Sequence, residues 1–117
     1  MNEVACSVGL YENFTGIIMW GAIEGVVKDA SFALSYVGDK KEVIDFYRGV
    51  WLNGTWYDGD FWSGTWMNGI WKDGVWHSGT WHNGSWCAGK WIGGKWKNGI
   101  VHKGLFLSGF SAPKIKV

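Results

Sequence analysis

From residue 49 onward, the pattern of apolar and polar positions repeats every five residues. Glycine occupies every fifth position from Gly49 to Gly109, and an aromatic residue follows most of these glycines by two positions. The residue before each glycine is usually Asn, Asp or Ser, and the residue after it is often β-branched. A helix with this pattern would lose about 1 kcal/mol per glycine relative to alanine, and its aromatic residues would spread around its surface. The period therefore predicts β-structure.

Two all-β architectures are compatible with the period. In the first, Asn-Gly and Asp-Gly form two-residue turns, because both central residues of a type I′ turn need positive φ. Very short strands joined by these turns, such as 65–67 and 70–72, then form a repetitive antiparallel β-meander with every Trp on one face. In the second, each pentapeptide forms one side of a four-sided pentapeptide β-solenoid, and glycine offsets the volume of Trp. The Asn-Gly pairs favour chain reversal, so the meander is preferred and the solenoid is the alternative.

The aromatic positions of the repeat form a candidate binding or packing face. They are Trp51, Trp56, Phe61, Trp66, Trp71, Trp76, Trp81, Trp86, Trp91 and Trp96. On one face of a meander, these rings would exceed the largest apolar patch of a typical monomer, ~300–600 Å². The N-terminal segment, a second copy of the chain or a foreign protein must then cover them. A solenoid hides the rings inside and removes this need.

The chain divides into three parts: an irregular β-rich segment at 1–48, the repeat array at 49–110 and a basic tail at 111–117. The first part is expected to pack on or cap the repeats. Residues 14–27 and 31–37 are rich in strand formers, and Gly38-Asp39 predicts a turn before a strand at 42–50; a short helix at 40–47 is the alternative. The apolar residues available for covering the array are Ile17, Ile18, Trp20, Val26, Phe32, Leu34, Ile44 and Phe46.

The net charge of +1 is unevenly distributed. Residues 1–49 hold four Lys/Arg against seven Asp/Glu, whereas residues 50–117 hold seven Lys against three Asp. A candidate basic patch consists of Lys90, Lys95, Lys97 and Lys103. Clustered positive charge would steer an acidic partner toward this end. Lysines that only keep the array soluble are the simpler interpretation.

The sequence offers little support for catalysis or a cofactor. In the meander, His77, His82, His102 and Cys87 lie too far apart to share a metal ion. The glycines match no phosphate-binding motif, and turn formation explains them. Cys6 and Cys87 have no disulfide spacing signature and are expected to be free thiols. No secretory signal and no membrane span are visible, so a cytoplasmic or virion-associated protein without cofactor or metal is expected.

The repeat unit G-x-W-x-N-G resembles the core of MORN repeats, whose hairpins form elongated meanders that contact proteins and membrane surfaces. A closer likeness, over residues 50–100, is to the tandem W-x-N-G-x-W arrays of tailed-phage and bacterial proteins. The period of five is far shorter than that of MORN repeats, and their Tyr and second glycine-rich stretch are absent, so a MORN function is not implied. The phage-like resemblance implies a virion component or a binder or inhibitor of a host protein.

These observations predict a non-catalytic repeat protein that acts as a structural or protein-interaction module. Its expected partner is a host protein or a second copy of the chain in a homo-oligomer. Binding of a nucleotide, nucleic acid or glycan by stacked Trp rings is the first alternative. An enzyme is the least favoured alternative.

Overall fold

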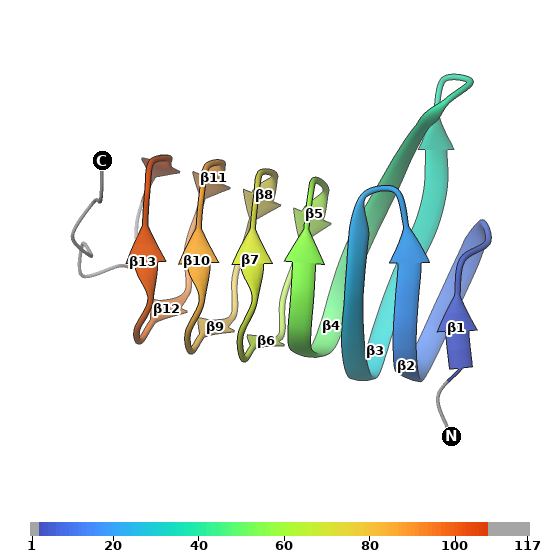
Figure 1. Cartoon of the computed structure of the whole chain (residues 1–117), viewed down its shortest axis with the longest axis horizontal. Helices are drawn as coiled ribbons and strands as arrows, with labels where there is room; N and C mark the ends of the chain where they lie inside the picture. Colours follow the sequence, from blue (N-terminus) through green and yellow to red (C-terminus); the bar gives the residue numbers. More distant parts are fainter. Residues whose placement is uncertain (1–2, 108–117) are drawn as a thin grey trace.

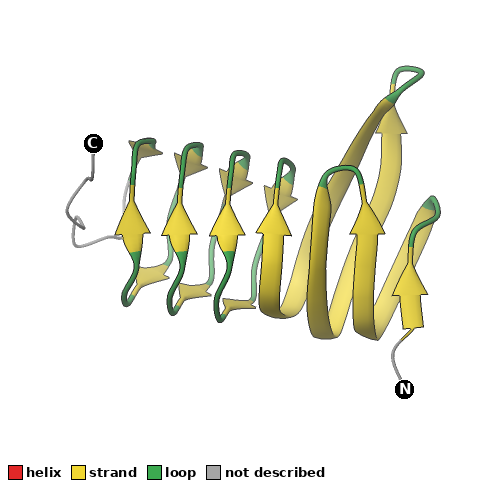
Figure 2. Cartoon of the chain, in the orientation of Figure 1, coloured by secondary structure: helices red, strands yellow, loops and turns green. Residues whose placement is uncertain are grey.

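The computed structural model describes residues 3–107, and every regular element among them is a β-strand (Figures 1 and 2). The longer strands are β1 (Glu3–Ala5), β2 (Gly9–Trp20), β3 (Ile23–Val37) and β4 (Lys41–Trp56). The two-residue strands are β5 (Asp60–Phe61), β6 (Thr65–Trp66), β7 (Ile70–Trp71), β8 (Val75–Trp76), β9 (Thr80–Trp81), β10 (Ser85–Trp86), β11 (Lys90–Trp91), β12 (Lys95–Trp96), β13 (Ile100–Val101) and β14 (Leu105–Phe106). The predicted all-β class is confirmed. Within residues 3–107 there is no helix of the length and apolarity needed to cross a membrane.

From residue 44 onward, the chain winds as a β-solenoid with 15 residues in each coil. Each short strand pairs in parallel with the strand 15 residues later, so that Trp51 lies beside Trp66 and Trp66 beside Trp81. A coil therefore contains three pentapeptides, one on each of three sides. The solenoid alternative is confirmed, although with three sides rather than four. The preferred antiparallel meander is wrong, because its hairpins would pair successive strands in opposite directions.

The backbone angles explain why the chain turns corners instead of reversing. A type I′ turn needs positive φ at both central residues. In the described part of the chain, however, Asn13 and Asp29 are the only non-glycine residues with positive φ, so no Asn or Asp of the repeat meets this requirement. The side chain before the glycine instead accepts a hydrogen bond from the glycine N–H, as at Asn53 Oδ1 and Gly54 N (2.9 Å). The same contact occurs at Asp58-Gly59, Asp73-Gly74 and Asn98-Gly99, so these pairs are local caps at corners.

The three sides are defined by the residues that stack above one another. The first side contains 49–53, 64–68, 79–83 and 94–98, with β6, β9 and β12. The second side contains 54–58, 69–73, 84–88 and 99–103, with β7, β10 and β13. The third side contains 44–48, 59–63, 74–78, 89–93 and 104–107, with β5, β8, β11 and β14. β4 supplies the first strand of all three sides.

The aromatic rings of each side stack in a column inside the solenoid. On the first side, Trp51, Trp66 and Trp81 have ring centroids 4.9 and 4.7 Å apart with nearly parallel planes. These distances match the ~4.8 Å spacing of hydrogen-bonded strands. Rings from adjacent sides meet edge to face, as in the Trp66–Trp71 pair at 5.7 Å and 70°. Stacked and edge-to-face pairs are both favourable aromatic arrangements, and the triangular interior contains both.

The N-terminal strands continue these columns beyond the repeats. β3 pairs antiparallel with both β2 and β4, and the three strands curve around the same axis as the coils (Figure 1). Phe32 stacks on Phe46 with a centroid distance of 6.4 Å, and Tyr11 stacks on Phe32 at 5.0 Å. Val27 and Ile23 pair with Trp51 and Trp56 and lie over the other two columns. This segment therefore closes the N-terminal end of the aromatic interior.

The residues expected to cover the array have two kinds of environment. Ile18, Trp20, Phe32, Leu34, Ile44 and Phe46 are buried, whereas Ile17 and Val26 are half-buried and pair with each other. The turn predicted at Gly38-Asp39 lies between β3 and β4, and strand β4 occupies the position of the alternative helix at 40–47. The boundary expected after residue 48 falls inside β4. The basic tail at 111–117 lies outside the described residues.

The corner glycines allow the coils to approach closely, as Gly79 illustrates. Its φ of +114° is one that residues with a side chain rarely adopt, and a Cβ there would lie 2.2 Å from the carbonyl oxygen of Gly64. That same oxygen accepts a hydrogen bond from the N–H of Thr80 at 3.0 Å. A side chain would therefore push apart the two coils that this hydrogen bond joins.

Gly79→Ala should lower the free energy of unfolding by roughly 3 kcal/mol or more, because strained φ and a backbone clash act together. Gly38→Ala is the matched control, since Gly38 also has positive φ (+67°) but has no atom within 4 Å of the added Cβ. We expect this control to cost about 1–2 kcal/mol. Urea unfolding of both variants measures the difference, and equal losses would contradict the close-approach explanation.

Trp71→Ala should cost about 3–5 kcal/mol of unfolding free energy, because it opens a cavity in a fully buried column. The matched control is Trp62→Ala, which removes a ring that is 42% exposed and should cost about 1 kcal/mol or less. Thermal and urea unfolding followed by far-UV circular dichroism provide the comparison. Similar losses from the two substitutions would contradict the assignment of the columns as the stabilising core.

Candidate functional surface

The candidate Trp face forms the interior of the solenoid. Trp51, Trp56, Phe61, Trp66, Trp71, Trp76, Trp81, Trp86 and Trp91 are each 0% exposed, and Trp96 is half-buried. These nine rings pack on one another and present no surface on which a base or sugar ring could stack.

The four candidate lysines all lie in the last two coils, but they point to different sides. Lys95 and Lys97 flank Trp96 on the first side, Lys90 lies on the third side, and Lys103 lies at the corner between the second and third sides. All four are exposed. They give one end of the solenoid a positive charge around its circumference rather than forming a patch on one side.

The three-sided winding places the histidines and Cys87 differently from the expected meander. His82 lies on the first side and His77 on the third, whereas the pairing of β10 with β13 places Cys87 and His102 in adjacent coils on the second. In the described part of the chain, no three His, Cys, Asp or Glu side chains are grouped in a way that could hold a metal ion. Cys6 and Cys87 are both free thiols.

The third side carries a polar and aromatic arrangement that the five-residue period does not reveal. Alternate residues of a strand point to opposite faces, so the residues on either side of each buried ring point outward. They form two rows along the solenoid axis. The upstream row is Asp45, Asp60, Val75, Lys90 and Leu105, and the downstream row is Tyr47, Trp62, His77, Ile92 and Leu107.

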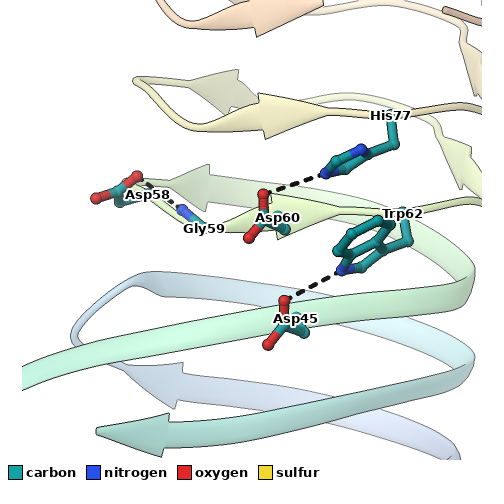
Figure 3. Close-up of polar contacts among 6 residues, drawn as sticks. All are labelled: Asp45, Asp58, Gly59, Asp60, Trp62 and His77. Carbon is teal, nitrogen blue, oxygen red and sulfur yellow. Dashed lines mark hydrogen bonds and ion pairs between the residues drawn. The ribbon is translucent and has the colours of Figure 1, made fainter. Parts of the chain in front are cut away.

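Contacts between the rows connect one coil to the next near the N-terminal end (Figure 3). Trp62 Nε1 donates a hydrogen bond to Asp45 Oδ1 at 3.1 Å, and His77 Nε2 lies 3.2 Å from Asp60 Oδ1. The Trp62 and His77 rings stack with centroids 3.8 Å apart and planes 8° from parallel. Each acceptor thus lies 17 residues before its partner, so the same contact occurs in two successive coils. These four side chains hold one another in fixed positions on the surface.

A groove of about 240 Å³ borders this arrangement where the β3–β4 hairpin extends beyond the coils (Figure 1). Its lining includes Lys41, Glu42, Asp58, Asp60 and Val75. Lys41 Nζ lies 3.4 Å from Asp58 Oδ2, and Asp58 Oδ1 accepts a hydrogen bond from the Gly59 N–H at 2.8 Å (Figure 3). Three carboxylates against one lysine make the groove and the adjoining rows acidic.

Comparison with protein-family models finds no match to this chain, and searches of curated proteins and of solved structures find none either. The geometry of the surface is therefore the basis for its interpretation. The N-terminal half of the third side combines an exposed Trp, an exposed Tyr and carboxylates on a rigid sheet. Aromatic residues of this kind are enriched at protein interfaces, where they contribute much of the binding energy.

A double-mutant cycle of Asp60→Ala and His77→Ala should give a coupling of about 0.5 kcal/mol in unfolding free energy, the usual value for a partly exposed pair. Asp60→Ala combined with His82→Ala is the control cycle, because His82 lies on another side, and its coupling should be near zero. Urea unfolding of the single and double variants measures both. A cycle for Asp60 and His77 that is also near zero would contradict a stabilising contact between them.

Proposed function

We propose that this protein is a non-catalytic interaction module, phage-encoded, that presents the third side of a rigid β-solenoid to a protein partner. The observation that carries the proposal is the exposed Trp62, which is held by the Asp45 carboxylate and by the His77 ring. A large amphipathic side chain fixed in advance loses little conformational entropy on binding, which is the advantage of a pre-organised interface. Asp45 and Asp60 beside it favour a partner with basic groups at the matching positions.

The burial of the aromatic columns supports a protein partner over a stacked ligand. The rings best suited to stacking on bases or sugars lie inside the solenoid and are occupied by one another. The outer surface instead offers ordered rows of side chains with a fixed spacing. The likeness of the repeat to tailed-phage arrays favours a virion component or a binder of a host protein. Purified virions and infected host lysate are therefore the two sources in which to seek the partner.

A photo-crosslinking residue placed at Trp62 tests the proposed surface, and the same residue placed at Tyr57 is the matched control. Both native side chains are 42% exposed, but Tyr57 lies on the second side. We expect one dominant crosslinked protein from position 62, weakened at least tenfold by Asp60→Lys, and no such product from position 57. Equal products from both positions, or none from position 62 in virions and lysate, would contradict the proposal.

A further inference from the structure

We propose that the third side pairs with the third side of a second copy of this chain, with the two solenoids antiparallel. The inference rests on the proposed role of this side as an interaction surface and names one partner for it. Its basis is the order of charges along the upstream row. Asp45 and Asp60 come first, Val75 lies in the middle coil, and Lys90 follows.

Asp60 and Lys90 are complementary to each other across the two copies when a two-fold axis runs parallel to the strands and passes through the Val75 coil; Asp45 then faces the exposed Leu105. Such an axis makes the two solenoids run in opposite directions. The upstream row of one chain then faces the upstream row of the other, and the two downstream rows face each other. Asp60 of one chain then meets Lys90 of the other, and the symmetry repeats this pair on the opposite side of the axis. Val75 meets its own copy at the centre. An isologous interface of this kind uses one patch twice and closes as a dimer.

The downstream row follows the same operation without placing like charges together. Tyr47 at the N-terminal end, which is exposed, meets the exposed Leu107 of the second copy. Trp62 of one chain faces the apolar Ile92 of the other, and His77 faces its own copy beside Val75. With parallel solenoids, both acidic halves would lie at the same end and Asp60 would not face Lys90, so charge complementarity favours the antiparallel pair.

The other two sides lack this complementarity. Across the described coils, the outward rows of the first side contain lysines at positions 95 and 97 but no acidic residue. The outward rows of the second side contain Lys72, and again no acidic residue, over the same part of the chain. The third side is therefore the side whose rows carry carboxylates at one end and an ammonium group at the other.

The size of the surface sets the strength expected of the pair. Five coils at ~4.8 Å and a width of about three residues at ~3.3 Å give a footprint of roughly 240 Å² per copy. Stable interfaces bury about 800 Å² per partner, so this dimer should be weak. Exposed charge pairs are screened by salt, and the association should therefore weaken as ionic strength rises.

Sedimentation velocity of the full chain over a range of concentrations tests the proposal in ~50 mM and ~500 mM salt. We expect the wild type to associate reversibly at low salt and to dissociate at high salt. Asp60→Lys places two like-charged contacts in the dimer, and so does Lys90→Asp, so each variant alone should associate at least tenfold more weakly. Lys95→Asp on the first side makes the same change of charge as Lys90→Asp and should leave association unchanged.

Mixing the two variants separates a lost interface from a damaged fold. An equimolar mixture of Asp60→Lys and Lys90→Asp should form a heterodimer, because both contacts are again between opposite charges. The double variant Asp60→Lys/Lys90→Asp should associate like the wild type. A wild type that stays monomeric at low salt would overturn the proposal, as would a mixture that fails to associate or a Lys95→Asp variant as weak as Lys90→Asp. A dominant foreign protein crosslinked at position 62 would still support the proposed function in each of these cases.

Discussion

The fold depends on one distance, the spacing between hydrogen-bonded coils. Backbone pairing sets this spacing near 4.8 Å, and flat rings stack comfortably at the same separation, as the 4.7 Å between Trp66 and Trp81 shows. Rings with parallel planes fill this interval with face-to-face contact. Tryptophan therefore supplies a large buried surface at every coil while the hydrogen bonds of the sheet stay intact. The glycines at the corners also maintain this spacing, because without a Cβ they let the backbone of one coil pack directly on the next.

Burial of the Trp rings removes water from their indole N–H groups, and this lowers the stability gained from burial. Among the described residues, the buried Nε1 atoms of Trp51, Trp56, Trp66, Trp71, Trp76, Trp81 and Trp86 have no oxygen or nitrogen acceptor. An unsatisfied buried donor is unfavourable by about 1–3 kcal/mol when nothing replaces its water. The edge-to-face neighbours surround these groups with aromatic faces, and weak N–H to π contacts are the interactions open to them. Burial of ring surface must outweigh this penalty in every coil, which is consistent with an array that contains so few smaller residues at these positions.

The sequence predicts the secondary structure of the repeat well but not the direction of pairing. Glycine at every fifth residue excludes a helix, and it serves a corner as well as a hairpin. The Asn-Gly pairs suggested reversal because Asn tolerates positive φ, yet at Asn53 the side chain caps the next amide and the glycine alone has positive φ. A second signal was present in the order of the residues before the glycines. Asn53, Asp58 and Ser63 are followed by Asn68, Asp73 and Ser78, and this 15-residue order indicates a coil of three pentapeptides. The rows containing Asp60, Trp62 and His77 follow from that count and could not be recognised without it.

The 15-residue coil also separates two kinds of change in length. Gain or loss of one pentapeptide would preserve every corner and every stacked ring, but it would rotate all later outward residues by one side of the triangle. Gain or loss of a whole coil would instead lengthen or shorten the rod and keep each side's chemistry in line. A change of five residues therefore preserves the packing of the interior, whereas only a change of fifteen residues also preserves the pattern of side chains on the outer surface. A protein built in this way can vary its length by duplication while retaining its surface pattern only when entire coils are copied.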